Sequence, residues 1–491
     1  MKLTPTIRNL RTVLLLCIAL IASIPLSART TLATQIDSLL ADPALKGGFQ
    51  GVIVRSLKDN AVWYERNPDM LFLPASNQKL VTSSAALALL GPDWRYTTRV
   101  YRSGPIDGAG TIRGAVYLVG VGDPTLTTDD LRAMAVAMKE RGVKRIFGKV
   151  IGDDTRFDKE RYGNSWSWDD MTWYYSAQIS ALNLNENLVT VSTEPGATEN
   201  SPIRAKITPP GYDVQISCNA TTGAKGSDTA LVYARDLGIN RITVNGTLAI
   251  EAKPDAHKPE QVTVENPTRY TVAVFTRILR DQGIAVTNGV GEGELTDKVA
   301  EVLAEHKSEP MRVLLNKLNK PSDNLIAECL LKSLGVEKGR AGTASAGIEV
   351  VTDWLKTIGV DAAGISMADG SGLSRVNYVT PRTLAAILKA MHAHPNGKLL
   401  EDSLPIAGVD GTLKNRMKGT PAEGNCRGKS GYVSGVSSLS GYVTTKADEP
   451  LLFTILMNNH LCRNREATRV QDAIVVLLAG ATNPFGAGAT P

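Results

Sequence analysis

Residues 73–90 read LPASNQKLVTSSAALALL, and this stretch decides the fold of the chain. From Leu80 to Leu90 the residues are apolar or small on every side of a helix, and Gly91-Pro92 ends it. A helix that is apolar all round is buried at the centre of a domain. Ser76 stands just before this run, and Lys79 follows three residues later. We therefore predict a buried central helix with a serine and a lysine at its N-terminal end.

The serine and the lysine share one face of this helix, because residues three apart lie about one turn apart. Ser76 is the only serine in the chain with a lysine three positions later. If the helix is buried, desolvation lowers the pKa of Lys79, and a neutral amine can take the proton of the serine. The alternative is an ordinary capping serine with an exposed lysine.

Two further motifs follow this pair along the chain. Ser322-Asp323-Asn324 stands between a turn and a helical run, and Lys429-Ser430-Gly431 opens a strand near the C-terminus. The set S-x-x-K, S-D-N and K-T-G is the signature of the penicillin-recognising serine enzymes. Ser217-Cys218-Asn219 is a second S-x-N sequence, but its flanks are strand-like. The turn-then-helix context of Ser322 fits the motif better.

With these motifs the chain resembles the low-molecular-mass class C penicillin-binding proteins, which are D-alanyl-D-alanine carboxypeptidases and endopeptidases of peptidoglycan. The resemblance covers essentially the whole mature chain. Besides the three motifs it rests on the segments 120–126 (GVGDPTL), 180–187 (SALNLNEN), 369–375 (DGSGLSR) and 408–413 (GVDGTL). It implies an α+β, serine β-lactamase/D,D-peptidase-like fold, in which an antiparallel sheet flanked by helices meets a helical lobe. It also implies a large β-rich insertion.

The resemblance implies a role for each motif residue. Ser76 would be the acylated nucleophile, Lys79 its general base, and Ser322 the relay that gives a proton to the leaving D-alanine. Asn324 would hold the substrate amide. Lys429 would attract the terminal carboxylate of the peptide and help to keep Lys79 neutral, since two nearby ammonium groups disfavour each other's protonation.

The strand that follows Lys429 is expected to bind the substrate through Ser430, Gly431 and Tyr432. The backbone N–H groups of Ser76 and Tyr432 would form the oxyanion hole. Ser430 stands where threonine is usual in the family, and Tyr432 where a small hydroxyl residue is usual. The balance between carboxypeptidase and endopeptidase action is therefore open.

By the same resemblance, a pocket between insertion and core binds the free end of the diamino acid in the stem peptide. Asp154 and Arg375 are the candidates for its amine and its carboxylate, because opposite charges suit a zwitterion. The alternative interpretation is that Asp154 is a turn residue and that Arg375 belongs to a structural salt bridge.

The hydrophobic pattern predicts a discontinuous catalytic domain interrupted by an insertion. Residues 29–95 and 268–483 are expected to form the penicillin-binding catalytic domain, with strands from both ends of the chain in one sheet. Residues 96–267 contain short β-prone runs separated by Gly, Pro and Asn, which predicts an inserted β-rich domain. The Gly-, Ala- and Pro-rich residues 484–491 are predicted to be a disordered tail.

Residues 1–28 have the order of a secretory signal peptide. Three basic residues precede an apolar run at 12–26, and two small residues, 27 and 28, follow it. This order predicts an exported protein, in the periplasm or another extracytoplasmic compartment. Leu26 occupies a position where a small residue is preferred, so an uncleaved membrane anchor is the alternative.

Composition and charge exclude several other functions. The 54 basic and 49 acidic residues give a net charge of +5, which provides no electrostatic case for nucleic-acid binding.

The cysteines beyond the signal segment are Cys218, Cys329, Cys426 and Cys462. They lack metal-ligand spacing, so no metal and no cofactor are predicted; they permit three disulfide pairings or free thiols. The predicted partners are peptidoglycan stem peptides, with β-lactam antibiotics as inhibitors, and a homodimer is left open.

Two other functions share part of this pattern. A β-lactamase would use the same acylation, but the chain has no E-x-x-L-N sequence to supply the water-activating glutamate of class A enzymes. A catalytically silent peptidoglycan-binding module would keep the motifs for folding alone, and the intact Ser76 and Lys79 count against it. We therefore expect slow turnover of penicillin and hydrolysis of stem peptides.

Overall fold

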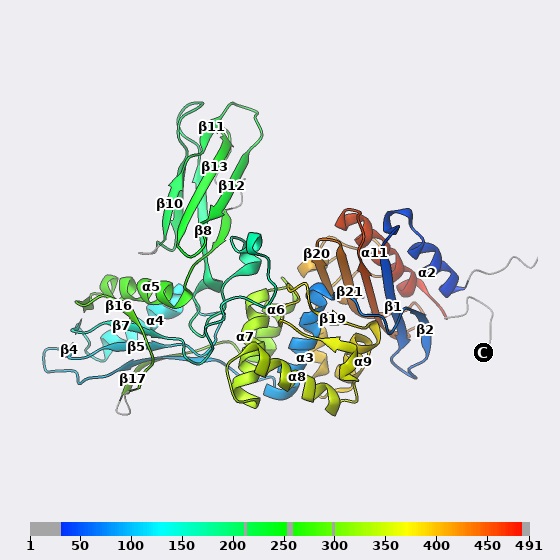
Figure 1. Ribbon diagram of the computed structural model, residues 1–491, viewed down its shortest axis with the longest axis horizontal. Helices are drawn as coiled ribbons and strands as arrows, with labels where there is room; N and C mark the ends of the chain where they lie inside the picture. The colour runs from blue at the N-terminus through cyan, green and yellow to red at the C-terminus, as the bar shows by residue number, and fades with distance from the viewer. Residues whose placement is uncertain (1–30, 211–213, 253–258, 297–299, 484–491) are drawn as a thin grey trace, which may run out of the picture.

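The computed structural model describes residues 31–210, 214–252, 259–296 and 300–483 (Figure 1). The predicted signal peptide and the predicted disordered tail lie outside these residues. The chain forms a sheet-and-helix part, which contains the first and last described helices, and an inserted part that projects from it (Figure 1). The helices and the antiparallel sheet of the first part confirm the predicted α+β class.

A five-stranded antiparallel sheet joins the two ends of the chain, in the order β2-β1-β22-β21-β20. Its strands are β1 (Phe49–Ser56), β2 (Val62–Arg66), β20 (Arg427–Val433), β21 (Val436–Thr444) and β22 (Pro450–Asn458). Helices α2 (Leu32–Leu40) and α11 (Asn464–Gly480) pack on one face of the sheet through a shared apolar core. The prediction that the start and the end of the chain share one sheet is confirmed.

A helical lobe lies against the opposite face of this sheet. Its helices are α3 (Gln78–Leu90), α6 (Met311–Asn319), α7 (Asn324–Lys338), α8 (Ala344–Thr357), α9 (Pro381–Ala393) and α10 (Gly397–Ser403), with a small ribbon of β18 (Ile365–Ser366) and β19 (Tyr378–Val379). Residues 78–87 of α3 are all buried, as their apolar pattern predicts. Leu80 on this helix and Ile53 on β1 are fully buried, and each such side chain contributes about 2 kcal/mol to stability.

The larger unit of the inserted part is a sheet in the order β16-β7-β5-β3-β17, packed against two helices. These elements are β3 (Thr97–Arg102), β5 (Val116–Val119), β7 (Val150–Asp153), β16 (Val290–Glu292), β17 (Glu301–Lys307), α4 (Thr128–Glu140) and α5 (Pro267–Asp281). A three-stranded sheet of β4 (Thr111–Ile112), β6 (Arg145–Ile146) and β15 (Ala285–Val286) adjoins it.

The smaller unit is all-β and projects at the top of Figure 1. Its sheets have the orders β14-β8-β9 and β10-β13-β11, and β12 also pairs with β13. The strands are β8 (Leu188–Glu194), β9 (Arg204–Thr208), β10 (Gln215–Cys218), β11 (Thr221–Gly223), β12 (Ala230–Arg235), β13 (Arg241–Ala249) and β14 (Glu260–Thr263). These strands agree with the predicted β-rich texture.

The inserted part differs from the prediction in two respects. β17 pairs with β3, with Glu301 opposite Arg102, and α5 packs on the same sheet. The predicted boundary at residue 267 therefore falls inside this part, which extends to Lys307. Helix α4 is a further difference, since only β-prone runs are predicted there; Thr127 begins it by accepting a hydrogen bond from the backbone N–H of Asp130.

The four cysteines in the described residues are unpaired, so the possible disulfides are not formed. Cys329 and Cys426 are buried, and burial raises the pKa of the Cys426 thiol to about 12. These two side chains therefore behave as small apolar residues. In the part of the chain that the structure covers, no helix is both long enough and apolar enough to cross a membrane.

Candidate active site

Ser76 lies where the sheet meets the helical lobe. It belongs to a short 3-10 turn, η2 (Ala75–Asn77), that leads directly into α3. Ala75 has a φ of 46°, a left-handed conformation that is uncommon for a residue with a side chain and is often found at functional sites. Asn77 Nδ2 donates a hydrogen bond of 2.7 Å to the Lys429 carbonyl oxygen, which holds this turn against β20.

Lys79 is fully buried one turn after Ser76. Its Nζ atom lies 3.0 Å from Ser76 Oγ, 2.5 Å from Asn324 Oδ1 and 2.8 Å from the Ser371 carbonyl oxygen. Desolvation is the largest influence on this amine and lowers its pKa to about 8, although nearby buried carboxylates, Asp369 first, act in the opposite direction. An amine with this pKa is partly neutral near physiological pH.

The three contacts of Lys79 determine what its neutral form can do. A neutral amine has two N–H donors and one lone pair. Asn324 Oδ1 and the Ser371 carbonyl oxygen are acceptors only, so each takes one N–H group. The lone pair then faces the hydroxyl of Ser76, and the arrangement can remove the proton of that hydroxyl.

The Ser322-Asp323-Asn324 motif forms the start of α7. Asp323 caps the helix by accepting from the backbone N–H three residues later, and Ser322 has a positive φ of 70°. Asn324 Nδ2 donates a hydrogen bond of 2.7 Å to the Tyr175 carbonyl oxygen, which directs Oδ1 of the same amide toward Lys79. Tyr175 belongs to the inserted part, so a loop of the insertion positions a side chain of the helical lobe.

Lys429 connects the third motif to the second. Its Nζ atom donates hydrogen bonds of 2.8 Å to Ser322 Oγ and 2.9 Å to the Ser430 carbonyl oxygen. The side chain is fully buried, and burial first and the charge of Lys79 second lower the pKa of Lys429. The structure thus places the five predicted catalytic residues in two hydrogen-bonded sets, one of Ser76, Lys79 and Asn324 and the other of Ser322 and Lys429. The Ser322-Asp323-Asn324 motif contributes one residue to each set.

Gly431 allows β20 to approach Ser76 closely. A Cβ atom at this position would lie 2.7 Å from Ser76 N, closer than real side chains come, so the approach requires glycine. Side chains alternate along a strand, and Ser430 and Tyr432 therefore point to the other face. Ser430 Oγ donates a hydrogen bond of 2.6 Å to Thr412 Oγ1, and the Tyr432 side chain is 54% exposed.

The cluster opens into a cavity of about 760 Å³, a volume typical of sites that bind small molecules or peptides. Three groups of residues line it. They are the motif residues, a loop of the inserted part together with Arg375, and the start of α11 together with Thr412. The lining residues include Ser76, Ser322, Asn324, Ser430, Gly431, Tyr432, Asp169, Asp170, Tyr174, Tyr175, Arg375, Ser434, Thr412, Arg416, Asn464, Arg465 and Thr468.

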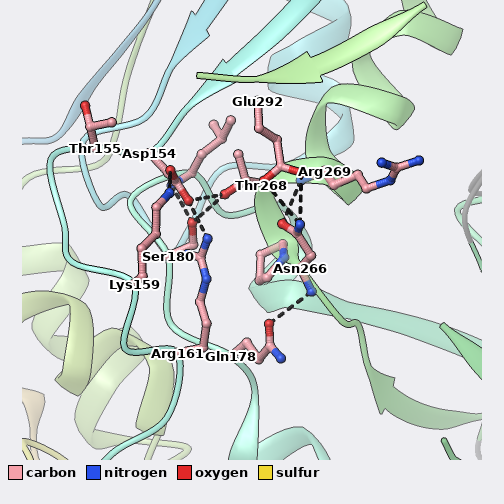
Figure 2. A network of polar contacts seen from close by, with 12 residues as sticks. Asp154, Thr155, Lys159, Arg161, Gln178, Ser180, Asn266, Thr268, Arg269 and Glu292 are labelled. Atoms are coloured by element: carbon pink, nitrogen blue, oxygen red, sulfur yellow. Dashed lines mark hydrogen bonds and ion pairs between the residues drawn. The ribbon is translucent and has the colours of Figure 1, made fainter. Parts of the chain in front are cut away.

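Asp154 does not line this cavity, which contradicts the prediction that it binds the substrate amine. Figure 2 shows the buried Asp154 carboxylate surrounded by its own partners. Lys159 and Arg161 form ion pairs with it, and Thr268 Oγ1 donates a hydrogen bond of 2.6 Å. Since two cations already neutralise this carboxylate, no charge is left for a substrate.

Asp154 instead helps to fix the base of the loop at 162–178, part of which lines the cavity. Arg161, which Asp154 binds, donates a side-chain hydrogen bond to the Ile179 carbonyl oxygen and accepts 2.7 Å from the Ile179 backbone N–H. The loop between these two residues contains Trp166, whose Nε1 donates 2.9 Å to Asp369 Oδ2 in the helical lobe. The loop is therefore fixed both at its base and at Trp166.

This loop carries the acidic residues that the sequence analysis missed. Asp169 and Asp170 line the cavity together with Arg375, which the sequence analysis did name. Arg375 is exposed and donates one hydrogen bond of 2.8 Å to the Ser434 carbonyl oxygen. The polar and aromatic run WSWDD at 166–170 is the feature of the sequence that could have indicated these acids. Whether they face the cavity depends on how the loop folds, which the run itself does not show.

Glu328 is a second residue that the sequence analysis missed. It lies one turn after Asn324 on α7, fully buried, and accepts hydrogen bonds of 2.8 to 3.1 Å from the backbone N–H groups of Gly370 and Ser371. These contacts fix the segment whose Ser371 carbonyl binds Lys79. Burial, followed by the charge of Asp369, raises the pKa of Glu328 to about 7.

Replacing Glu328 with glutamine is expected to shift the pH dependence of acylation to lower pH. The negative charge of Glu328 raises the pKa of Lys79, so its removal makes the amine neutral at a lower pH. The glutamine oxygen can still accept the hydrogen bond from Ser371. The measurement is the rate of penicillin acylation against pH, in the variant and in the wild type. A midpoint that moves to higher pH would show that Glu328 does not act on Lys79 in this way.

The similarities of the chain to known proteins agree with this site. The sequence profile of the D-Ala-D-Ala carboxypeptidase 3 (S13) family matches residues 32–481. A D-alanyl-D-alanine carboxypeptidase of Actinomadura sp. (strain R39) is 40% identical over 463 residues, which cover 92% of this chain and 85% of that protein. Another relative, the D-alanyl-D-alanine carboxypeptidase DacB of Haemophilus influenzae, is 28% identical over 449 residues, covering 90% of this chain and 92% of that protein.

Solved structures support the same assignment. The crystal structure of penicillin binding protein 4 (dacB) from Haemophilus influenzae superposes with a TM-score of 0.81 at 26% identity, covering 91% of this chain and 99% of that one. A structure of the same protein complexed with a novel β-lactam gives a TM-score of 0.75. These superpositions confirm the predicted D,D-peptidase-like fold. The chain belongs to the D-Ala-D-Ala carboxypeptidase 3 (S13) family.

Proposed function

We propose that the chain cleaves peptidoglycan stem peptides after D-alanine through an acyl-enzyme on Ser76. Family membership makes it a serine peptidase; the roles of the individual residues are the proposal. The observation that carries it is the 3.0 Å contact between Ser76 Oγ and the Nζ atom of the fully buried Lys79.

In the proposed mechanism, Lys79 takes the hydroxyl proton while Ser76 Oγ attacks the carbonyl carbon of the penultimate D-alanine. The backbone N–H groups of Ser76 and Tyr432 bind the oxyanion, and each donor contributes about 3 kcal/mol in comparable acyl transfers. The C–N bond then breaks, and the leaving amine receives the proton through Ser322. Water afterwards hydrolyses the ester, which releases the shortened stem and restores the serine.

The ends of the substrate would be bound by charged residues on opposite sides of Ser76. Lys429 and Ser430 would bind the terminal carboxylate. Thr412 is hydrogen-bonded to Ser430 and would add a second hydroxyl group there, in place of the small hydroxyl residue that Tyr432 replaces. Asp169, Asp170 and Arg375 also line the cavity and would bind the free amine and carboxylate of the stem-peptide diamino acid. These acids take the role first expected of Asp154.

The proposed location and assembly follow from the substrate. A peptidase of peptidoglycan acts outside the cytoplasm, and we expect residues 1–28 to direct export. Sedimentation of the purified mature chain tests whether it forms a homodimer. N-terminal sequencing of the exported protein tests cleavage after Ala28, and retention of residues 1–28 on a membrane-bound form would favour the anchor.

Incubation of the enzyme with labelled penicillin, followed by intact-mass measurement, separates the candidate functions. The proposal predicts a stable adduct of one penicillin per chain, and release of D-alanine from a defined pentapeptide. Rapid release of hydrolysed penicillin would instead identify a β-lactamase. Absence of both the adduct and D-alanine release would identify a catalytically silent module.

A further inference from the structure

We propose that the cavity contains a subsite for the leaving strand of a cross-linked substrate, in which Arg465 binds a carboxylate of the second stem peptide. This inference rests on the proposed function, because it concerns the group that acylation of Ser76 expels. It identifies the residue by which the enzyme would distinguish a cross-link from a terminal D-alanine.

The direction of the side chains on β20 places this subsite. Gly431 faces the nucleophile, so Ser430 and Tyr432 face the other side of the strand. Ser437 on β21 lies opposite Tyr432 in the register, and its Oγ donates a hydrogen bond of 2.8 Å to Asn464 Oδ1 at the start of α11. The first turn of α11 therefore borders the side of β20 that the terminal carboxylate would occupy.

The cavity continues beyond the position of that carboxylate. From Ser430 it extends past Thr412 to Arg465 and Thr468, which lie on the first two turns of α11. A terminal D-alanine ends in the carboxylate that Ser430 would bind, and its side chain is only a methyl group. The space on this side therefore suits a larger leaving group.

Two arginines line this side of the cavity, and one of them is already neutralised. Arg416 Nε donates a hydrogen bond of 2.8 Å to Asp472 Oδ1 within an ion pair. Arg465 is exposed, and among the residues that the structure describes no hydrogen bond or ion pair engages its guanidinium. The neighbouring Glu466 accepts 3.0 Å from the Arg463 backbone N–H and caps α11. Arg465 is thus the cation on this side that can bind an anionic ligand.

A second stem peptide supplies such an anion. When D-alanine is joined to the side-chain amine of a diamino acid in another stem, the leaving strand carries that residue and the C-terminal carboxylate of its own chain. Asp169 and Asp170 line the cavity on the loop of the inserted part, which is a different element from α11. A substrate whose free amine lies toward these acids would extend its leaving strand toward Arg465, so opposite charges fix the orientation of the cross-link.

The test compares two substrates in the variant Arg465→Gln. The ratio of kcat/KM for a cross-linked stem dimer to kcat/KM for the D-Ala-D-Ala pentapeptide is expected to fall about fivefold, the effect of losing one partly exposed charge pair. Arg465→Lys keeps the charge and is expected to retain most of the ratio. Arg463→Gln is the matched control, because it removes an exposed arginine two residues away that does not line the cavity, and its ratio should equal that of the wild type.

Three results would overturn the inference. They are an unchanged ratio in Arg465→Gln, an equal loss on both substrates, and an equal change of the ratio in Arg463→Gln. Failure of the proposed function would look different, because wild-type enzyme would then form no penicillin adduct and release no D-alanine. The penicillin acylation rate of each variant shows that it is folded and that Ser76 is active.

Discussion

Replacing Ser76 with alanine is expected to abolish the penicillin adduct and to slow D-alanine release by about five orders of magnitude. The variant keeps the buried Lys79, the cavity and the charged residues at its ends. It lacks the oxygen that forms the ester, so binding continues without covalent chemistry. Intact-mass measurement after incubation with penicillin, and D-alanine release from the pentapeptide, give the two readouts.

The chain offers a matched control on the same helix. Ser84 is buried on α3, and its Oγ has no hydrogen-bond partner among the described residues, so Ser84→Ala removes a hydroxyl without breaking a contact. This variant is expected to form the adduct at close to the wild-type rate. An adduct of unchanged mass on Ser76→Ala would show that another residue is the nucleophile.

Replacing Lys79 with methionine is expected to slow acylation by about 10⁴-fold while the protein stays folded. General-base catalysis contributes up to about this factor, and no other neutral amine contacts Ser76 Oγ within the described residues. A buried amine costs free energy of desolvation, which methionine avoids. Asn324 Oδ1 and the Ser371 carbonyl each lose a hydrogen-bond donor, at about 1 kcal/mol apiece, so the two effects on stability oppose each other.

Two measurements separate catalysis from folding in this variant. The acylation rate should fall by the expected factor, while the melting temperature stays within a few degrees of the wild type. If the methionine variant were acylated at the wild-type rate, this result would contradict the role of Lys79 as the base. A large drop in melting temperature would contradict the proposed balance of desolvation and hydrogen bonding at this position.

The sequence predicts that the three motifs meet in one site, because each motif combines particular residue types with a local context. The apolar run after Lys79 predicts burial, and the structure shows the amine fully buried. The order of the motifs predicts that Ser322 and Lys429 join this site, and their side chains lie 2.8 Å apart. The long insertion between the motifs does not disturb this prediction, since both ends of the chain build one sheet.

Non-local pairing explains what the sequence does not predict. β3 and β17 are about 200 residues apart in the sequence, and the residues of neither strand indicate that the two pair with each other. Because β17 belongs to the sheet of the inserted part, the predicted boundary at residue 267 is misplaced. Asp154 has a charge that suits an amine, but the sequence does not indicate that Arg161 and Lys159 bind it first. Some contacts in the site are made by backbone carbonyl groups, such as the Tyr175 carbonyl that accepts a hydrogen bond from Asn324. Every residue has such a group, so no residue type in the sequence indicates the contact.

We attribute the reactivity of Ser76 to the burial of Lys79, which leaves this amine partly neutral near physiological pH. The most direct test of this role is the rate of acylation of the wild-type enzyme by a penicillin whose side chain does not titrate, from about pH 6 to pH 10. Because only the neutral amine accepts the serine proton, the rate should rise with pH, reach half its maximum near the Lys79 pKa of about 8, and level off above it. A rate that stays flat or falls across this range would contradict the account.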